Sequence, residues 1–189
     1  MAMRCPGCGG KAFTVQRAAG GLEAAVCGGC GGMWVSVQRY FAFLAERESG
    51  DQSSPGPATP GEEAGADSEA LKLCPVCQKF MRYYPVGHGL VFGVDRCGDC
   101  GGFFLNAKEW EALAAHGLET RLHFIPSDAW QAEVARGLRT AHDAESLVRR
   151  LGAEDAAELE RVTEWIAGHR HRDVMMAHLR ERLHLPVHG

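Results

Sequence analysis

The chain has 189 residues, of which 46% are hydrophobic and 23% charged, so we expect a globular protein of one or two domains. A net charge of −4 argues against binding of a polyanion by the molecule as a whole. No apolar run approaches the ~20 residues that a membrane-spanning helix needs. The opening MAMRCPGC also lacks the apolar core of a signal peptide. We therefore expect a cytoplasmic protein that does not associate with membranes.

The eight cysteines form four C-x-x-C pairs, which group into two quartets. In each quartet the gap between the two pairs is typical of a four-thiolate zinc site. A reducing compartment disfavours disulfides, and iron in a rubredoxin-like site is the alternative metal. We predict two zinc ions, one in each quartet: Cys5, Cys8, Cys27 and Cys30, then Cys74, Cys77, Cys97 and Cys100.

The two quartets belong to an internal repeat with a period of about 70 residues. Each copy reads C-P-x-C, a β-hairpin, C-x-x-C-G-G-hydrophobic-aromatic, and a short helix. Gly20-Gly21 and Gly87-His88-Gly89 are the expected hairpin turns. A unit of this size buries too little surface to fold unaided, so we expect metal binding and folding to be linked.

The helix of each repeat has a start signal. Ser36 and Asn106 are the expected N-caps, and Glu109 completes a capping box in the second copy. We expect Trp34 and Phe104 to pack each helix on its own ribbon.

Between the repeats runs SGDQSSPGPATPGEEAGADSEA, which has five acidic residues and no Lys or Arg. This composition is typical of a disordered tether, so we expect the two ribbons to move independently. The predicted organisation is zinc ribbon 1 over residues 1–48, a disordered acidic linker over 49–70, zinc ribbon 2 over 71–118 and a helical C-terminal region over 119–189.

The C-terminal region has apolar residues at helical spacing in three segments, which Gly152 and Gly168 separate. A helix start is expected near Ser127. We interpret the region as a small helical hairpin or bundle that caps the second ribbon, with its Trp and Leu stripes as core. Several histidines are scattered here, and we assign them no metal: His169, His171, His178, His184 and His188. We expect His88 to lie in a turn and His123 to lie at the surface, rather than to bind metal.

The repeat unit resembles the bacterial transcription factor IIB-type zinc ribbon family. The residues that carry the resemblance are Cys5-Pro6-x-Cys8 with Cys27-x-x-Cys30-Gly31-Gly32-Met33-Trp34, and Cys74-Pro75-x-Cys77 with Cys97-x-x-Cys100-Gly101-Gly102-Phe103-Phe104-Leu105-Asn106. The family has Trp where Phe104 stands, and a helix with Glu near its third residue, where the first copy has Arg39. The tail also looks like an extension of some bacterial members. The resemblance implies a zinc-dependent fold and suggests a link to transcription.

The expected fold is therefore a small zinc-dependent α+β protein with two tandem four-cysteine zinc ribbons and a helical C-terminal region. We expect no enzymatic activity, because four protein thiolates leave no open position on zinc. The ribbons would serve as macromolecular interaction modules, with a protein as the favoured partner. The alternatives are nucleic-acid binding, weakly supported by basic residues near Phe13 and Trp34, and thiol redox or oxidant sensing. The sequence does not define the oligomeric state.

Overall fold

A computed structural model describes residues 3–49 and 71–184, with side chains omitted at 48 and 49. The chain divides into two compact units, Met1–Ala135 and Arg136–Gly189. The expected linker falls almost wholly on residues outside the described part. Among the described residues, no helix is both long and apolar enough to span a membrane.

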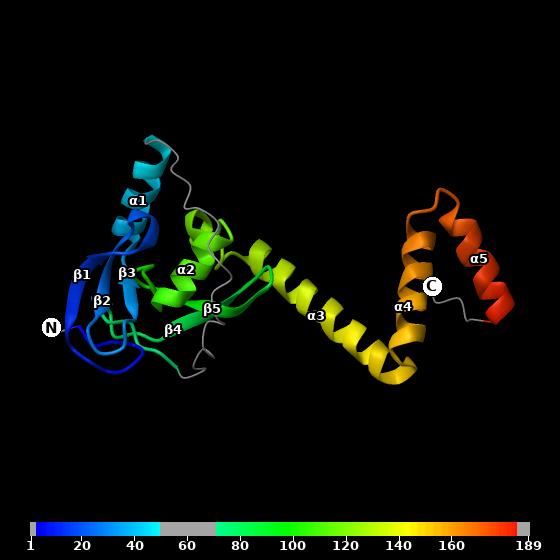
Figure 1. The fold of residues 1–189 in the computed structure, drawn as a ribbon, viewed down its shortest axis with the longest axis horizontal. Coiled ribbons are helices and arrows are strands. Elements are labelled where there is room, and N and C mark those ends of the chain that lie inside the picture. The colour runs from blue at the N-terminus through cyan, green and yellow to red at the C-terminus, as the bar shows by residue number, and fades with distance from the viewer. Residues whose placement is uncertain (1–2, 50–70, 185–189) are drawn as a thin grey trace. The chain divides into compact units, whose positions relative to one another are not determined.

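The first unit contains both repeats, and each repeat folds into three strands and a helix (Figure 1). The two copies thus have the same element order, as the sequence repeat predicts. The elements of the first copy are β1 (Phe13–Arg17), β2 (Glu23–Cys27), β3 (Met33–Val35) and α1 (Val37–Ser49). Those of the second are β4 (Met81–Gly87), β5 (Leu90–Cys97), β6 (Phe103–Leu105) and α2 (Ala107–Ala115).

The two ribbons share one six-stranded sheet of order β1-β2-β3-β6-β5-β4. Strands β3 and β6 pair antiparallel, and Trp34 lies opposite Phe104 in the register. These two residues hold equivalent places in the repeat, so the pairing is centred on a local pseudo-twofold axis. The expectation that the ribbons move independently is wrong, because backbone hydrogen bonds and a common core join them.

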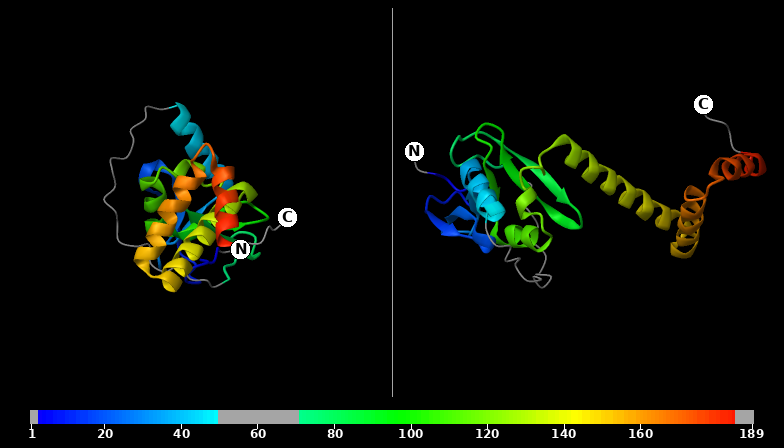
Figure 2. Two further views of the ribbon diagram at one scale, coloured as in Figure 1. Left: turned by 90° about the vertical axis from the view of Figure 1, so that its right-hand side faces the viewer. Right: turned by 90° about the horizontal axis from the view of Figure 1, so that it is seen from above.

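Strands β3 and β6 are buried on both faces of the sheet, since successive side chains of a strand point to opposite sides and every residue of these two strands is buried. On one face, β3 and β6 contribute Met33, Val35, Phe103 and Leu105 to the main core. Helices α1 and α2 cover this face through buried side chains that join the same core: Tyr40, Phe43, Trp110 and Leu113. Figure 2 gives two further views of these helices and the sheet. Trp34 and Phe104 lie on the other face, with the cysteines.

Helix–ribbon contacts cross from one repeat to the other. The Trp110 Nε1–H of α2 donates to the Ala19 carbonyl in the turn of the first hairpin, at 2.8 Å. The Trp110 ring also meets Phe43 of α1 edge-on, with centroids 5.7 Å apart. Each helix therefore stabilises the other repeat as well as its own.

The helix starts agree with the sequence. The Glu109 N–H donates to Asn106 Oδ1 at 2.8 Å, and the Asn106 N–H donates to Glu109 Oε2 at 2.7 Å, which completes the capping box. Ser36 Oγ accepts from the Arg39 N–H at 3.3 Å. Ser127 Oγ accepts from the Trp130 N–H, at the start of the next helix.

Three helices form the C-terminal region: α3 (Asp128–Leu151), α4 (Ala153–Ala167) and α5 (Arg172–Leu183). The first turns of α3 pack on the hairpin of the second ribbon, where Trp130 Nε1–H donates to the Val86 carbonyl at 2.9 Å. The three helices are separated at Gly152 and Gly168, as predicted, and Trp130 belongs to the main core. The prediction that the later Trp and Leu stripes form a core is wrong, because Leu138 and Trp165 are exposed.

Candidate metal centres

Each quartet of cysteines gathers its four sulfurs into one cluster, with all four Sγ atoms within 4.8 Å of one another. The Sγ atoms of Cys5 and Cys30 lie 3.5 Å apart. In the second cluster, those of Cys74 and Cys100 lie 3.7 Å apart. A tetrahedral zinc ion with Zn–S bonds of ~2.3 Å requires S···S separations of ~3.8 Å. The thiolate sets therefore fit one zinc ion each, as the spacing predicts.

The C-x-x-C turns are shaped to hold two sulfurs on one ion. The residue after the second cysteine of a turn takes a left-handed conformation, which glycine adopts without strain at Gly9, Gly31 and Gly101. In the remaining turn Gln78 takes that conformation, with φ of 58°. Its amide Nε2 donates to the Cys74 carbonyl at 3.1 Å, which ties the side chain to the turn and helps to hold a conformation unfavourable for a non-glycine residue.

Backbone N–H groups face the first sulfur of a turn. The Gly29 N–H lies 3.4 Å from Cys27 Sγ, and the Cys77 N–H lies 3.3 Å from Cys74 Sγ. Such donors stabilise a thiolate, which is the form that binds metal. In the first site the Gly29 and Cys30 amides lower the pKa of Cys27 to about 7.

Other sulfurs resist ionisation before a metal binds. Burial raises the pKa of Cys5, and likewise that of Cys74, from 9.0 to about 12. These thiols carry protons at neutral pH, so zinc must displace protons when it binds.

Trp34 and Phe104 connect the two metal sites across the β3–β6 pairing. They cluster with Met81 and with buried cysteines from both quartets. A Cβ at Gly32 would stand 2.5 Å from Phe104 Cζ, and a Cβ at Gly102 would clash with the Trp34 ring. The second glycine of each C-G-G motif therefore makes room for the aromatic ring of the other ribbon. The expectation that each aromatic packs its helix on its own ribbon is wrong.

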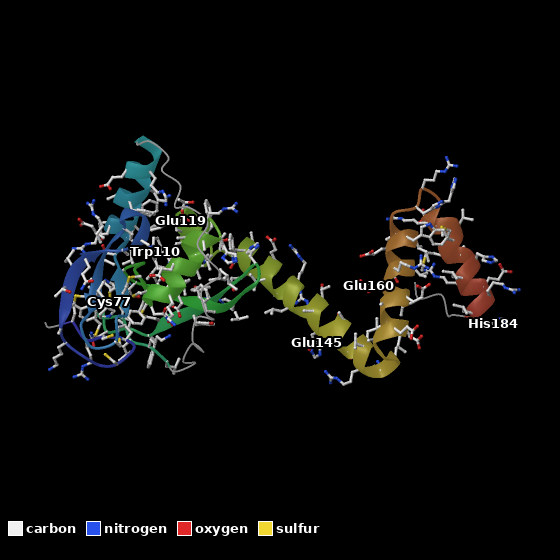
Figure 3. The ribbon with its side chains drawn as sticks, in the orientation of Figure 1. Cys77, Trp110, Glu119, Glu145, Glu160 and His184 are labelled. Atoms are coloured by element: carbon white, nitrogen blue, oxygen red, sulfur yellow. The ribbon has the colours of Figure 1, made fainter. Side chains whose placement is uncertain are left out.

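The two sites differ in exposure. Cys8 and Cys30 of the first site are exposed, whereas Cys77 and Cys100 of the second are partly covered. Figure 3 labels Cys77 among the sulfurs of the ribbon unit. Chemically, each set is a closed shell of four protein ligands, the arrangement of a structural zinc site.

The histidines do not extend these sites. Within residues 3–49 and 71–184, the two cysteine quartets are the only groups of three or more His, Cys, Asp or Glu close enough to share a metal. His88 lies in the predicted turn, with φ of 53°. His188 falls outside the described residues. His123 is half-buried rather than at the surface, because its ring packs beside Tyr40.

A polar contact between the first repeat and the segment that follows the second repeat escaped the sequence analysis. Tyr40 is fully buried, and its hydroxyl donates to the Glu119 carbonyl at 3.1 Å and lies 3.2 Å from His123 Nδ1. Arg47 of α1 forms an ion pair of 2.8 Å with Glu119 Oε1. Burial raises the pKa of Tyr40 and lowers that of His123. These residues lie more than seventy positions apart and match no local motif, so only the fold brings them together.

The fold and the two thiolate clusters define a zinc ribbon protein in which a pair of ribbons is joined through one sheet. Residues 4–45 and 73–116 each match the model of a family described as transcription factor zinc-finger. The chain thus carries two zinc ribbons of this family, one in each matched segment. No significant match was found among curated proteins or among solved structures.

Proposed function

We propose that the protein is a non-catalytic zinc protein whose paired ribbons bind a protein partner, in a transcription-linked setting of the kind that the family description names. Zinc in this proposal is structural, because each quartet fills a tetrahedral shell and leaves no position for water or substrate. The role of the metal is to fix the turns that present the binding surface.

One observation carries the choice of a protein partner. Four large apolar side chains surround the Cys74–Cys77 turn at the outside of the second ribbon. We call them the knuckle patch: Leu71, Leu73, Val76 and Phe80, with exposed fractions of 79%, 42%, 57% and 68%. Leu73 and Phe80 are bridged across the turn, so the patch lies on one local structure. Contiguous exposed apolar residues of this kind mark protein interaction sites.

The ribbon fold itself does not need this patch. At the repeat-related positions of the first ribbon stand Arg4, Gly7 and Lys11, in place of Leu73, Val76 and Phe80. Both ribbons nevertheless assemble the same turn and the same four-sulfur cluster. The apolar residues of the second turn are therefore available for binding rather than required for folding.

Nucleic-acid binding is less favoured at the first ribbon, where the sequence suggested it. Stacking of bases requires exposed aromatic rings beside basic residues. Trp34 is only 4% exposed, and Arg17 is paired with Glu23 at 3.6 Å. The basic residues near the first ribbon thus lack the aromatic platform that the sequence suggested.

The test uses the zinc-loaded full chain with a photo-crosslinking residue at position 82, beside the patch. Wild-type protein should crosslink to a protein partner and retain it in about 1 M salt, where exposed charges are screened. Val76→Ser and Phe80→Ser should lose the partner. The control Val91→Ser alters a residue that is 84% exposed near the far end of the hairpin, and it should keep the partner. Oligonucleotide binding with a steep salt dependence, unaffected by Phe80→Ser, would overturn the proposal.

A further inference from the structure

The two metal sites have the same ligands but different surroundings. In both sites the first cysteine of each turn is buried. The second cysteine of each turn is exposed in the first site, at Cys8 and Cys30, but partly covered in the second, at Cys77 and Cys100. A thiolate reacts with an oxidant only if the oxidant reaches the sulfur. The difference in exposure therefore predicts a difference in reactivity.

The turns of the first site lack side chains beside Cys8. A Cβ at Gly29 would stand 3.5 Å from Cys8 Sγ, and a Cβ at Gly10 would stand 3.3 Å from the same sulfur. At the equivalent positions of the second repeat stand Asp99 and Lys79. The second site thus carries two side chains at places where the first site has only hydrogen atoms.

The helix starts also protect the second site more than the first. Val37, the first residue of α1, lies against Gly101, the glycine after the last cysteine of the second quartet, because a Cβ at Gly101 would stand 2.8 Å from Val37 Cγ2. In the related place, α2 begins with the shorter Ala107. Within the described part of the chain, a Cβ at Gly31 would meet nothing within 4 Å apart from its immediate neighbours. Gly101 is accordingly buried, whereas Gly31 is half-buried and its turn is open.

We propose that the first zinc site is a site of oxidative modification, at which a hydroperoxide oxidises Cys8 or Cys30 while the second quartet stays reduced. Zinc holds the sulfurs as thiolates. The exposed thiolate attacks one peroxide oxygen, the O–O bond breaks, hydroxide leaves and the sulfur becomes a sulfenic acid. A second thiolate of the quartet then attacks that sulfur, forms a disulfide and displaces another hydroxide.

The cluster supplies this second thiolate. Cys5 Sγ lies 3.5 Å from Cys30 Sγ, and Cys27 Sγ lies 3.6 Å from Cys8 Sγ. In sum, two thiolates lose two electrons and the peroxide gains them. The disulfide removes two of the four ligands, so the first site should release its ion.

Oxidation of the first site should leave a distinct intermediate, with one disulfide in the first quartet and four reduced thiols in the second. Loss of the first ion weakens the second ribbon through the shared sheet, so a zinc count alone does not locate the reaction. The positions of the oxidised thiols do. The inference goes beyond the proposed function, since it holds whatever partner the ribbons bind.

The test treats the reduced, zinc-loaded full chain with less than one equivalent of hydrogen peroxide. Dimedone traps sulfenic acid, differential alkylation with peptide mapping locates disulfides, and a chromophoric chelator follows released zinc. The first quartet should oxidise at least about fivefold faster than the second, with dimedone on Cys8 or Cys30. Equal rates, or oxidation that begins at Cys77 or Cys100, would overturn the inference. So would a protein whose two quartets both stay reduced in a large excess of peroxide.

Reciprocal exchange between the repeats tests the physical cause. Gly29→Asp should slow oxidation of the first quartet, and Asp99→Gly should accelerate that of the second. Neither position has a positive φ, so each turn accommodates both residues. Unchanged rates in both variants would show that coverage does not control reactivity and would overturn the inference.

A third variant and a control keep the test independent of these turns. Val37→Ala removes the side chain over Gly101 and should accelerate oxidation of the second quartet, whereas Val91→Ser on the hairpin should change neither rate. Native mass spectrometry before the oxidant is added should count two zinc ions in every variant, which separates altered reactivity from failure to fold. None of these measurements uses the crosslink at the knuckle patch, so they stand or fall separately from the proposed function.

Discussion

Replacing Trp34 in the first ribbon with alanine should weaken zinc binding in the second. The Trp34 ring is 4% exposed and lies over Gly102, two residues after the last cysteine of the second quartet. Truncation of a buried tryptophan to alanine costs about 3–5 kcal/mol of unfolding free energy. Because metal binding and folding are linked in a ribbon, part of this loss should appear as lower zinc affinity.

The size of the effect follows from how the ring is shared. If half of the loss is felt at the second site, its apparent affinity falls by about 1.5–2.5 kcal/mol, or about tenfold to sixtyfold. Competition with a chromophoric chelator measures affinity, and native mass spectrometry counts the ions retained. Trp34→Phe should keep most of the affinity, because Phe104 fills the equivalent place in the other repeat.

The control is Val15→Ala, which alters a 58% exposed residue of the same ribbon and should change neither site measurably. Loss of zinc from the first site alone in Trp34→Ala would refute the reasoning. That result would mean that the two ribbons fold and bind metal separately despite the shared sheet.

Three further predictions concern buried polar groups and protons. Lys72→Met should lower the unfolding free energy by about 3–5 kcal/mol. The substitution removes the ammonium group that lies 2.7 Å from the buried Asp95 carboxylate. A denaturation midpoint equal to that of the wild type would contradict this prediction. An NMR titration should give His123 a pKa below 6.5, the value of an exposed histidine. Neutral His123 therefore contributes to the stability of the fold above pH 6.5, and this contribution is lost as the pH falls through the lower pKa of the folded state. A measured pKa above 6.5 would contradict the observed burial. Zinc binding at neutral pH should release protons, because the pKa of Cys5 and that of Cys74 are about 12 before metal binds. Calorimetry in buffers of different ionisation enthalpy should detect the released protons. The affinity for zinc should also fall as the pH falls.

The consequences of ligand loss also differ from those expected for separate ribbons. With the ribbons taken as independent modules, Cys27→Ser would unfold only the first. In the shared sheet, β2 ends at Cys27 and pairs with β3, which in turn pairs with β6 of the second ribbon. Damage at one site therefore reaches the other through a continuous ladder of backbone hydrogen bonds.

The sequence determined the features that depend on short stretches of chain. Four C-x-x-C turns need only a few residues each to place two sulfurs, so spacing alone identified both metal sites. The capping box at Asn106 and the helix boundary at Gly152 are likewise local, and both lie where the sequence predicted. The repeat was visible because each copy preserves the same local motifs.

Only the tertiary structure decided how the repeats meet. Pairing of β3 with β6 joins segments about seventy residues apart, and three-residue strands carry little periodicity from which to predict a partner. The sequence analysis assigned no role to the second glycine of each C-G-G motif, whose lack of a Cβ makes room for the other ribbon's ring. The C-terminal stripes had the spacing of a core, but spacing records only which side of a helix is apolar. Whether that side is covered depends on what packs against it, and burial, unlike periodicity, is a property of the folded assembly.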